Sequence, residues 1–460
     1  MNAKRRKNQL ELAFAPEEEG EARIAGAEGT ESCTTKDGNE RLAEEQLMEE
    51  VLRRDNLKKA LERVQANRGR PGVDGVSVEQ LPGYLRKHWP KLREQLLSSR
   101  YRPKPVLRKE IPKPEGGGTR QLGIPTVVDR FIQQALHQVL QERWDASFSE
   151  HSYGFRPNRR AHQAVAAAQE YVQQGYDWVV DIDLEKFFDR VNHDRLMSLV
   201  AKRVKDKRVL KLIRAFLNAG VMDEGLVSPT TEGTPQGGPL SPLLSNLVLD
   251  ELDRELERRG HRFCRYADDS NIYVRSERAG QRVMKSITRF ITHQLRLKVN
   301  ARKSAVGRPW QRKFLGFRLG KGRSNKRCIA PLSERRFRAQ VRRLTARSTG
   351  RKVEDVVERL NRYLAGWHGY YRFCQTPSVL NRLDSWTRRR LRQLIWVQWK
   401  TRRRRYRALR HRGVSSRLAG DTVASRHGPW RLSRSPALHQ ALSDASFRSL
   451  GLYSLGGSRA

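Results

Sequence analysis

Two short β-prone runs and a polar tip make up the stretch Phe263-Cys264-Arg265-Tyr266-Ala267-Asp268-Asp269-Ser270-Asn271-Ile272-Tyr273-Val274. This pattern predicts a tight β-hairpin. Its tip carries two adjacent carboxylates, Asp268 and Asp269, which repel each other unless a cation neutralises them. Carboxylate oxygens are hard ligands that suit Mg²⁺ or Mn²⁺. Asp-Asp pairs also occur in many solvated turns, so the hairpin alone leaves both a metal site and a solvated turn open.

A second predicted strand, Trp178–Asp183, ends in a further carboxylate. Strand alternation puts Asp181 and Asp183 on the same face. A carboxylate at the end of a buried strand is costly unless it is paired or binds a metal ion. We therefore expect Asp183, Asp268 and Asp269 to converge on one site. Two divalent ions held there would clamp the attacking and leaving oxygens of an in-line phosphoryl transfer.

Three motifs, in this order along the chain, resemble those of reverse transcriptases. Asp183 to Asp189 resembles the first palm motif, Asp-x-x-x-x-Phe-Asp, and its spacing selects Asp183 rather than Asp181 as the metal ligand. Gly233 to Pro242 resembles the Pro-Gln-Gly motif, and Tyr266-Ala267-Asp268-Asp269 resembles the Tyr-x-Asp-Asp box. With the flanking segments, the chain from about Leu57 to its C-terminus resembles the group II intron reverse transcriptase/maturase family, in its bacterial, endonuclease-lacking, group IIC-like form.

The resemblance implies an α+β fold of the right-hand polymerase type. Fingers and a palm, built from an antiparallel sheet and packed helices, would precede an α-helical thumb, or maturase domain X. We expect a flexible acidic tail at 1–40, an N-terminal extension at 41–100, fingers and palm at 101–320, the thumb and domain X at 321–410, and a basic C-terminal tail without an HNH endonuclease at 411–460. One helix is expected from about Arg41 through Val64.

Other elements are predicted from local patterns. Arg108 to Thr126 is expected to form a β-hairpin with a glycine-rich tip. Apolar residues at helical spacing predict helices over Asp129–Trp144, Val353–Trp367 and Leu380–Ile395.

An RNA-directed DNA polymerase is the activity that the resemblance implies. It would extend a DNA primer on an RNA template with dNTPs, using two Mg²⁺ ions, with Mn²⁺ as a substitute, held by Asp183, Asp268 and Asp269. In the family, the side chain at the position of Phe188 blocks a 2′-hydroxyl on the incoming sugar, whereas Phe187 is expected to pack in the core. Contacts to the dNTP are expected from Lys113, Arg120, Phe188, Gln236 and Lys303. Contacts to nucleic acid are expected from Arg156, Tyr266, Arg388, Arg389, Arg390 and Arg392.

Composition supports a polyanionic partner. The 460 residues carry a formal net charge of +42, which most simply indicates nucleic acid, although a ribosome-associated or membrane-surface protein would share it. Residues 321–460 hold 34 basic and 7 acidic residues, a net of +27. No apolar run approaches the ~18 residues of a transmembrane helix, and Met1–Leu10 lacks the apolar core of a signal peptide.

Four widely spaced cysteines argue against a zinc module or a disulfide framework. They suit a reducing compartment, so we expect a bacterial cytoplasmic, nucleoid-associated protein. Its oligomeric state is left open.

Besides DNA synthesis, the resemblance implies that the protein binds its own group II intron RNA. It also implies that the protein assists the splicing and retrohoming of that RNA. Two rivals come from other classes. One is an RNA-folding maturase with an idle polymerase site, against which the intact aspartates and Phe188 argue. The other is a domesticated relative that serves in antiviral defence. Finding the gene inside or outside a group II intron RNA would distinguish them.

Overall fold

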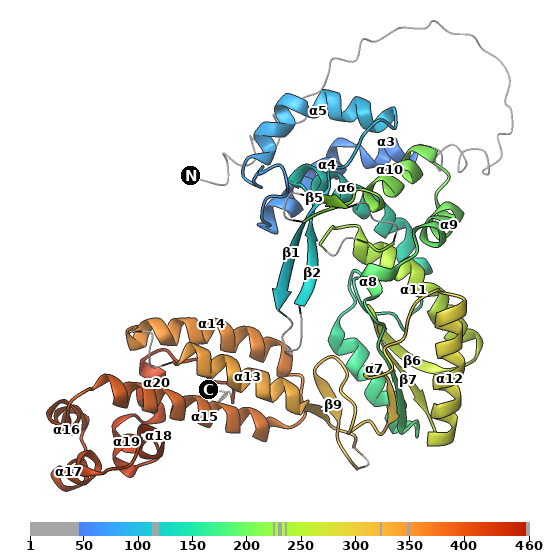
Figure 1. Ribbon diagram of the computed structural model, residues 1–460. Helices are drawn as coiled ribbons and strands as arrows, with labels where there is room; N and C mark the ends of the chain where they lie inside the picture. The colour runs from blue at the N-terminus through green and yellow to red at the C-terminus, as the bar shows by residue number, and fades with distance from the viewer. Residues whose placement is uncertain are drawn as a thin grey trace, which may run out of the picture. The chain divides into compact units, whose positions relative to one another are not determined.

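The computed structural model describes residues 46–112, 119–223, 226–228, 232–234, 237–322, 324–346 and 350–456. The chain divides into two compact units, here called unit 1 and unit 2 (Figure 1). Unit 1 comprises Met1–Ala164 and Val180–Val306, and unit 2 comprises Val165–Val179 and Gly307–Ala460. The chain passes from unit 1 to unit 2 near residue 306, while the expected end of the palm at 320 stays a prediction. The acidic tail expected at 1–40 lies outside the described residues.

Unit 1 opens with two helices where the sequence pattern predicts one. Helix α3 (Leu47–Val51) is separated from α4 (Arg54–Ala66) by Leu52 and Arg53, and the extended backbone of Arg53 (φ −61°, ψ 138°) interrupts the helical path. The side-chain amide of Asn56 donates to the Val51 carbonyl at 2.8 Å and so satisfies an acceptor freed by the break. The prediction of one continuous helix was wrong for this reason, and its first residues, 41–45, lie outside the described range.

Further helices begin before residue 306. They are α5 (Leu81–Leu97), α6 (Val127–Trp144), the short 3₁₀ helix η2 (Asp145–Ser147), α7 (Ala161–Gln173), α8 (Phe187–Arg190), α9 (His193–Arg203), α10 (Lys207–Leu217), α11 (Ser241–Arg258) and α12 (Glu277–His293). The boundary between the units falls within α7. Helix α6 confirms the predicted apolar periodicity, because Phe131, Ile132 and Leu136 are buried.

The first sheet has the strand order β2-β1-β4-β5. Its strands are β1 (Val106–Pro112), β2 (Thr119–Ile124), β4 (Val221–Asp223) and β5 (Leu226–Ser228). β1 and β2 pair antiparallel from Leu107↔Ile124 to Pro112↔Thr119. The predicted hairpin is thus confirmed, while its glycine-rich tip, at 113–118, is not among the described residues.

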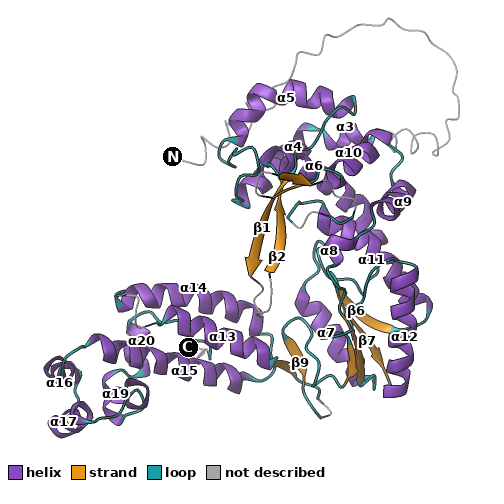
Figure 2. Cartoon of the chain, in the orientation of Figure 1, coloured by secondary structure: helices purple, strands orange, loops and turns teal. Residues whose placement is uncertain are grey.

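The second sheet has the strand order β6-β7-β3-β8. Its strands are β3 (Trp178–Ile182), β6 (Arg262–Tyr266), β7 (Asp269–Val274) and β8 (Ala305–Gly307). Helix α12 packs closely on it, since a Cβ added to Gly280 would lie 2.6 Å from a methyl carbon of Val306 and 3.5 Å from one of Val274. Figure 2 shows the strands of this sheet beside α12. This sheet carries the candidate catalytic residues.

Unit 2 is predominantly helical (Figure 2). Its elements are β9 (Phe317–Leu319), β10 (Arg327–Ile329), α13 (Pro331–Leu344), α14 (Val353–Tyr371), α15 (Pro377–Gln398), α16 (Arg402–His411), α17 (Ser416–Ala424), α18 (Pro429–Leu432), α19 (Pro436–Ala441) and α20 (Asp444–Ser449). The predicted apolar stripes of α14 and α15 are confirmed, because Leu360, Leu364 and Leu391 belong to one buried core. None of the described helices is both long and apolar enough to span a membrane.

The segment expected to be a basic tail is part of this core. Leu432, Leu438, Phe447 and Leu455 are each no more than 6% exposed and pack in the same cluster as α14 and α15. Four short helices, α17 to α20, each contribute only a few apolar residues. That is too weak a periodic signal to stand out in the sequence, and it explains why the expectation of a tail was wrong.

Polar side chains of α14 and α15 also fasten the last described residues. The Asn361 amide donates to the Gly451 carbonyl at 2.7 Å, and its oxygen accepts from the Tyr453 backbone at 2.8 Å. The Asp384 carboxylate accepts from the Ser454 hydroxyl at 3.0 Å and from the Leu455 backbone at 3.2 Å. These bonds hold the segment across both helices.

Candidate active site

The hairpin that carries the paired aspartates has a two-residue turn. β6 and β7 pair antiparallel up to Tyr266↔Asp269, which leaves Ala267 and Asp268 at the tip. Ala267 has a φ of +56°, which is uncommon for a residue other than glycine. The predicted hairpin is confirmed. The nucleic-acid contact expected of Tyr266, which ends β6 and is partly exposed, stays a prediction.

A buried arginine holds this turn from beneath. The fully buried Arg265 guanidinium pairs with the Asp253 carboxylate of α11 at 2.5 Å. It also donates to the Ala267 carbonyl at 3.0 Å, to the Asn246 amide oxygen at 3.1 Å and to the Ser152 hydroxyl at 2.7 Å. A buried charge of this kind is stable only when its donors are satisfied. Our sequence reasoning missed Arg265, although a basic residue inside an otherwise apolar strand was the available signal.

The loop at Ser152–Pro157 presses against the same turn. A Cβ added to Gly154 would lie 2.2 Å from the Ala267 backbone nitrogen, so no larger residue fits without moving the turn. The Gly154 carbonyl accepts from the Asn246 side-chain amide at 2.9 Å, and the Tyr153 backbone donates to the Arg265 carbonyl at 2.8 Å. Loop, strand and helix therefore fix the turn together.

Arg156, expected to contact nucleic acid, is instead turned into the protein. Its guanidinium donates to the Asp145 carboxylate at 2.9 Å and to the Ser149 carbonyl at 2.6 Å, and its side chain is 4% exposed. Since its donors are used internally, we withdraw Arg156 from the expected interface. Its role in the structure is to fix the loop that contacts the turn.

Asp183 directly follows β3, the strand next to β7. Its backbone amide donates to the Ser304 hydroxyl at 3.0 Å, and the Asn300 amide donates to its carbonyl at 2.8 Å. The Lys303 ammonium lies 3.6 Å from the Asp183 carboxylate. The structure thus puts Lys303 beside a candidate metal ligand, while the dNTP contact expected of Lys303 stays a prediction.

Tyr273 lies on β7 and is buried. Burial raises the pKa of its hydroxyl far above its ordinary value, and the charges of Asp181 and Asp269 add to this effect.

Within the described part of the chain, no group of three or more His, Cys, Asp or Glu side chains is arranged to hold a metal ion. Convergence of Asp183, Asp268 and Asp269 on one metal site therefore stays a prediction. The donors fit it chemically, because carboxylate oxygens on neighbouring strands of one sheet suit a hard divalent ion. The Lys303 ammonium beside Asp183 also indicates that this carboxylate is stabilised by positive charge.

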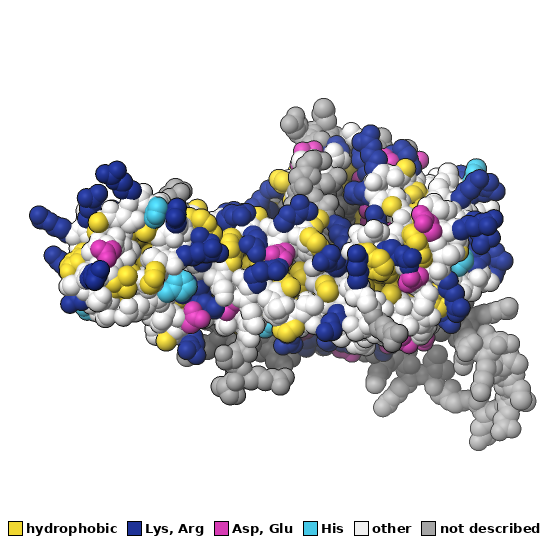
Figure 3. All heavy atoms as spheres, turned by 90° about the horizontal axis from the view of Figure 1, so that it is seen from below, with side chains coloured by type: hydrophobic (Ala, Val, Ile, Leu, Met, Phe, Trp, Pro, Cys, Tyr) yellow, Lys and Arg dark blue, Asp and Glu magenta, His cyan; other side chains and the backbone are white. Residues whose placement is uncertain are grey.

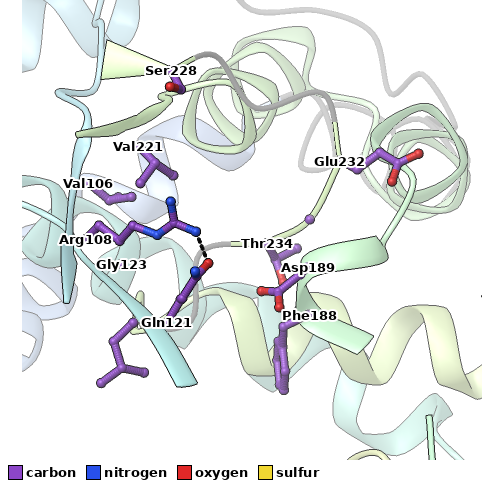
Figure 4. Close-up of a pocket in the computed structure, with 12 residues that line it drawn as sticks. Val106, Arg108, Gln121, Gly123, Phe188, Asp189, Val221, Ser228, Glu232 and Thr234 are labelled. Carbon is purple, nitrogen blue, oxygen red and sulfur yellow. Dashed lines mark hydrogen bonds between the residues drawn. The ribbon is translucent and has the colours of Figure 1, made fainter. Parts of the chain in front are cut away.

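Phe187 and Phe188 face different surroundings. Phe187 is 2% exposed in the core, whereas Phe188 is partly exposed and borders a cavity of about 260 Å³. Figure 4 shows Arg108 and Gln121, which are hydrogen-bonded to each other, on one wall of this cavity, and Phe188, Asp189 and Thr234 on the other. The expected core position of Phe187 is confirmed. Three expected dNTP contacts cannot be placed, because Lys113, Gln236 and the Arg120 side chain lie outside the described structure.

Four arginines of α15 expected to contact nucleic acid are engaged inside unit 2. Arg388 pairs with Asp384 and Asp444, and Arg389 stacks 3.6 Å above the Trp430 ring. Arg390 donates to the Thr345 hydroxyl at 3.2 Å, and the buried Arg392 donates to the Leu442 carbonyl at 2.9 Å. Their partners come from α15 itself (Asp384), from Thr345 before it and from the segments that follow it, and the nucleic-acid contacts expected of the four arginines stay a prediction.

A group of exposed basic side chains of unit 2 lies on α16. Arg402, Arg403, Arg404 and Arg407 are exposed there. Figure 3 shows Lys and Arg side chains spread over the end of the molecule formed by α16 and α17, on the left, with few acidic ones between them. Such a surface suits a phosphate backbone.

Comparisons with known proteins match two consecutive parts of the chain to two families. The model of the family "Reverse transcriptase (RNA-dependent DNA polymerase)" matches residues 111–319, and that of the family "Group II intron, maturase-specific domain" matches residues 334–413. Protein YkfC of Escherichia coli (strain K12) is 32% identical over 320 residues, which cover 60% of this chain and 83% of YkfC. Group II intron-encoded protein LtrA of Lactococcus lactis subsp. cremoris is 35% identical over 204 residues, 44% of this chain and 34% of LtrA.

An α+β unit with a paired-aspartate hairpin, followed by a helical unit, defines a reverse transcriptase with a maturase domain. The chain belongs to the group II intron reverse transcriptase/maturase family. Its polymerase domain is an RNA-directed DNA polymerase domain. Membership implies catalysis with divalent metal ions and binding to nucleic acid. Because the match spans only about a third of LtrA, the activities of that whole protein do not transfer with it.

Proposed function

We propose that this protein copies RNA into DNA at the hairpin of β6 and β7 and acts as a maturase for its own intron RNA. The observation that carries the proposal is the rigid presentation of Asp268. Its turn is held by the buried Arg265 and by Gly154, on a strand next to the one that leads to Asp183. Preorganised acidic groups of this kind are what nucleotidyl transfer requires from a protein.

In this proposal Asp183, Asp268 and Asp269 would hold two Mg²⁺ ions, for which Mn²⁺ can substitute. When bound, the ions supply activation of the primer 3′-hydroxyl and neutralise charge on the leaving pyrophosphate. Phe188 would lie against the sugar of the incoming dNTP. Lys113, Arg120 and Lys303 would attract its phosphates, and Gln236 would contact the nascent base pair.

For the maturase role, intron RNA would bind unit 2, where α16 exposes its arginines. Assistance of splicing and retrohoming into a DNA target in the bacterial cytoplasm are parts of the same proposal. The matching maturase-specific domain at 334–413 and the intron-encoded relative LtrA support them.

Two substitutions test the polymerase site. Asp268→Asn and Asp183→Asn each remove a metal ligand but change little volume, so cDNA synthesis with Mg²⁺ should fall to background while RNA binding stays near the wild-type level. The measurement is extension of a DNA primer on an RNA template, with a gel-shift assay for binding. Asp194→Asn is the matched control, because this α9 carboxylate is 81% exposed and its loss should leave extension unchanged. Extension by the Asp268→Asn protein near the wild-type rate would refute the assignment.

A further inference from the structure

One phenylalanine of the loop at Ser152–Pro157 is both exposed and strained. Phe155 is 45% exposed, among the most exposed of the large apolar side chains in the described chain. Its backbone has a φ of +58°, in the left-handed region that bulky residues rarely adopt. Exposure of an aromatic ring and backbone strain both disfavour the folded state, and such costs cluster where a residue serves a ligand. Phe155 is therefore poorly explained as a packing residue.

Both neighbours of Phe155 are fixed. Gly154 abuts the turn at Ala267, and Arg156 is bonded to Asp145 and Ser149. The ring thus stands on a rigid support that is directly coupled to the turn carrying Asp268. A binding group presented in this way loses little conformational entropy when a ligand arrives.

Phe155 borders a cavity of about 460 Å³ in unit 1. Phe188, Gly69, Arg130, Gly237 and Gly238 also line this cavity. Its glycines present bare backbone to the cavity, and two of them also pack closely on side chains, since a Cβ at Gly238 would lie 2.4 Å from the Gln133 amide oxygen and one at Gly69 only 2.0 Å from the Arg130 guanidinium. The buried Nε of Arg130 has no hydrogen-bond partner among the described residues. An aromatic face with bare backbone and a guanidinium beside it suits a nucleobase and its phosphate.

Phe188 indicates which base would occupy this cavity. Its side chain borders both this cavity and the separate cavity beside β1 and β2 that contains Arg108 and Gln121. The proposed function assigns Phe188 to the sugar of the incoming nucleotide, whose phosphates face the β1–β2 hairpin. The partner base of that nucleotide then lies on the other side, toward Phe155 and Gly237–Gly238.

Resting on the proposed polymerase function, we propose that Phe155 is a stacking platform for the templating base of the RNA, in the cavity that it shares with Phe188. The ring holds this base in register above the turn that carries Asp268. Stacking requires only a π-face, so it tolerates every template sequence.

A binding cycle tests the contact directly. Wild type, Phe155→Leu and Phe155→Trp are titrated, by fluorescence anisotropy, against an RNA-template/DNA-primer duplex and against the same duplex with an abasic template position opposite the incoming nucleotide. In wild type the abasic site should weaken binding by about 5- to 150-fold, the range measured for single stacked bases. Phe155→Leu should bind the intact duplex more weakly by a similar factor and show almost no further abasic penalty. Phe155→Trp should behave as wild type.

Several controls isolate the stacking contact. An abasic site three nucleotides further along the template should have equal effects on wild type and Phe155→Leu, and Leu450→Ala, which alters an exposed apolar residue of unit 2, should match wild type throughout. Phe155→Gly removes the ring and accepts a positive φ, so it repeats the test if the leucine variant fails to fold. An abasic penalty in either ring-less variant as large as in wild type overturns the proposal. Primer extension by wild type on the intact duplex is scored separately, so failure of the proposed function is distinguishable from failure of the stacking.

Discussion

Phe188 and its neighbour Phe187 allow a matched test of sugar selection. Phe188→Ala removes the ring at the edge of the cavity, so incorporation of ribonucleotides relative to deoxynucleotides should rise by about tenfold or more, because exclusion by a wall is lost. Single-nucleotide extension with each rNTP and dNTP measures the ratio. Phe187→Ala is the control. This residue is 2% exposed, so the variant should lose about 3–5 kcal/mol of stability without changing sugar preference. If Phe188→Ala leaves the ratio of ribonucleotide to deoxynucleotide incorporation unchanged, Phe188 serves only in packing.

At the residue scale, local motifs were predictable and partners distant in sequence were not. The hairpin around Asp268 follows from the residue pattern within a few positions, and the different places of Phe187 and Phe188 were implied by the family resemblance. The role of an arginine depends instead on which acceptor groups the folded chain brings next to it. Arg156 meets Asp145, 11 residues away, and Arg392 meets the Leu442 carbonyl, 50 residues away. In the sequence both arginines were expected to contact nucleic acid, because these distant partners could not be predicted, so their structural roles were missed.

Helix α6 carries a buried histidine that should make stability depend on pH. Burial lowers the pKa of His137 to about 4, with a smaller contribution from the charge of Arg63 on α4. The folded state therefore favours neutral imidazole, while the unfolded chain takes up a proton below about pH 6.5. Its stabilising contribution is present above that value and is lost as the pH falls toward 4, by up to about 3 kcal/mol.

Thermal unfolding of wild type and His137→Leu between pH 4.5 and 7.5 measures this effect. The wild-type midpoint should fall more steeply than that of the variant on acidification, because only wild type binds the extra proton on unfolding. Parallel curves would show that His137 is not the group responsible. His411, which is exposed on α16, provides the control substitution His411→Leu, for which the slope should match wild type.

At the element scale, strongly periodic segments were predicted well. Helices α6, α14 and α15 and the two hairpins all have patterns long enough to identify them. The break at Arg53 was not visible, because the residues on both sides favour helix and the interruption depends on Asn56 bonding to Val51. A local side-chain-to-backbone hydrogen bond therefore decided this boundary over helix propensity.

For the whole molecule, the last described residues should matter to the stability of unit 2. Leu455 is 1% exposed in the core shared with α14 and α15, whereas Leu450 is 37% exposed. Leu455→Ala should therefore destabilise unit 2 by about 2–5 kcal/mol, and Leu450→Ala by less than about 0.5 kcal/mol. Denaturant unfolding followed by tryptophan fluorescence compares them, since Trp386, Trp396 and Trp399 lie in or against that core. Equal unfolding midpoints for the two variants would show that the segment containing Leu455 does not stabilise unit 2.

The inward-facing arginines have a consequence for how tightly RNA is held at different ionic strengths. Each phosphate contact releases condensed counterions and contributes roughly 0.7–0.9 to the slope of log affinity against log salt concentration. Arg156, Arg265 and Arg392 are buried against protein acceptors, so they release none. The formal charge of +42 therefore overstates the number of cations available to RNA, and affinity falls less steeply with added salt than a count of basic residues suggests.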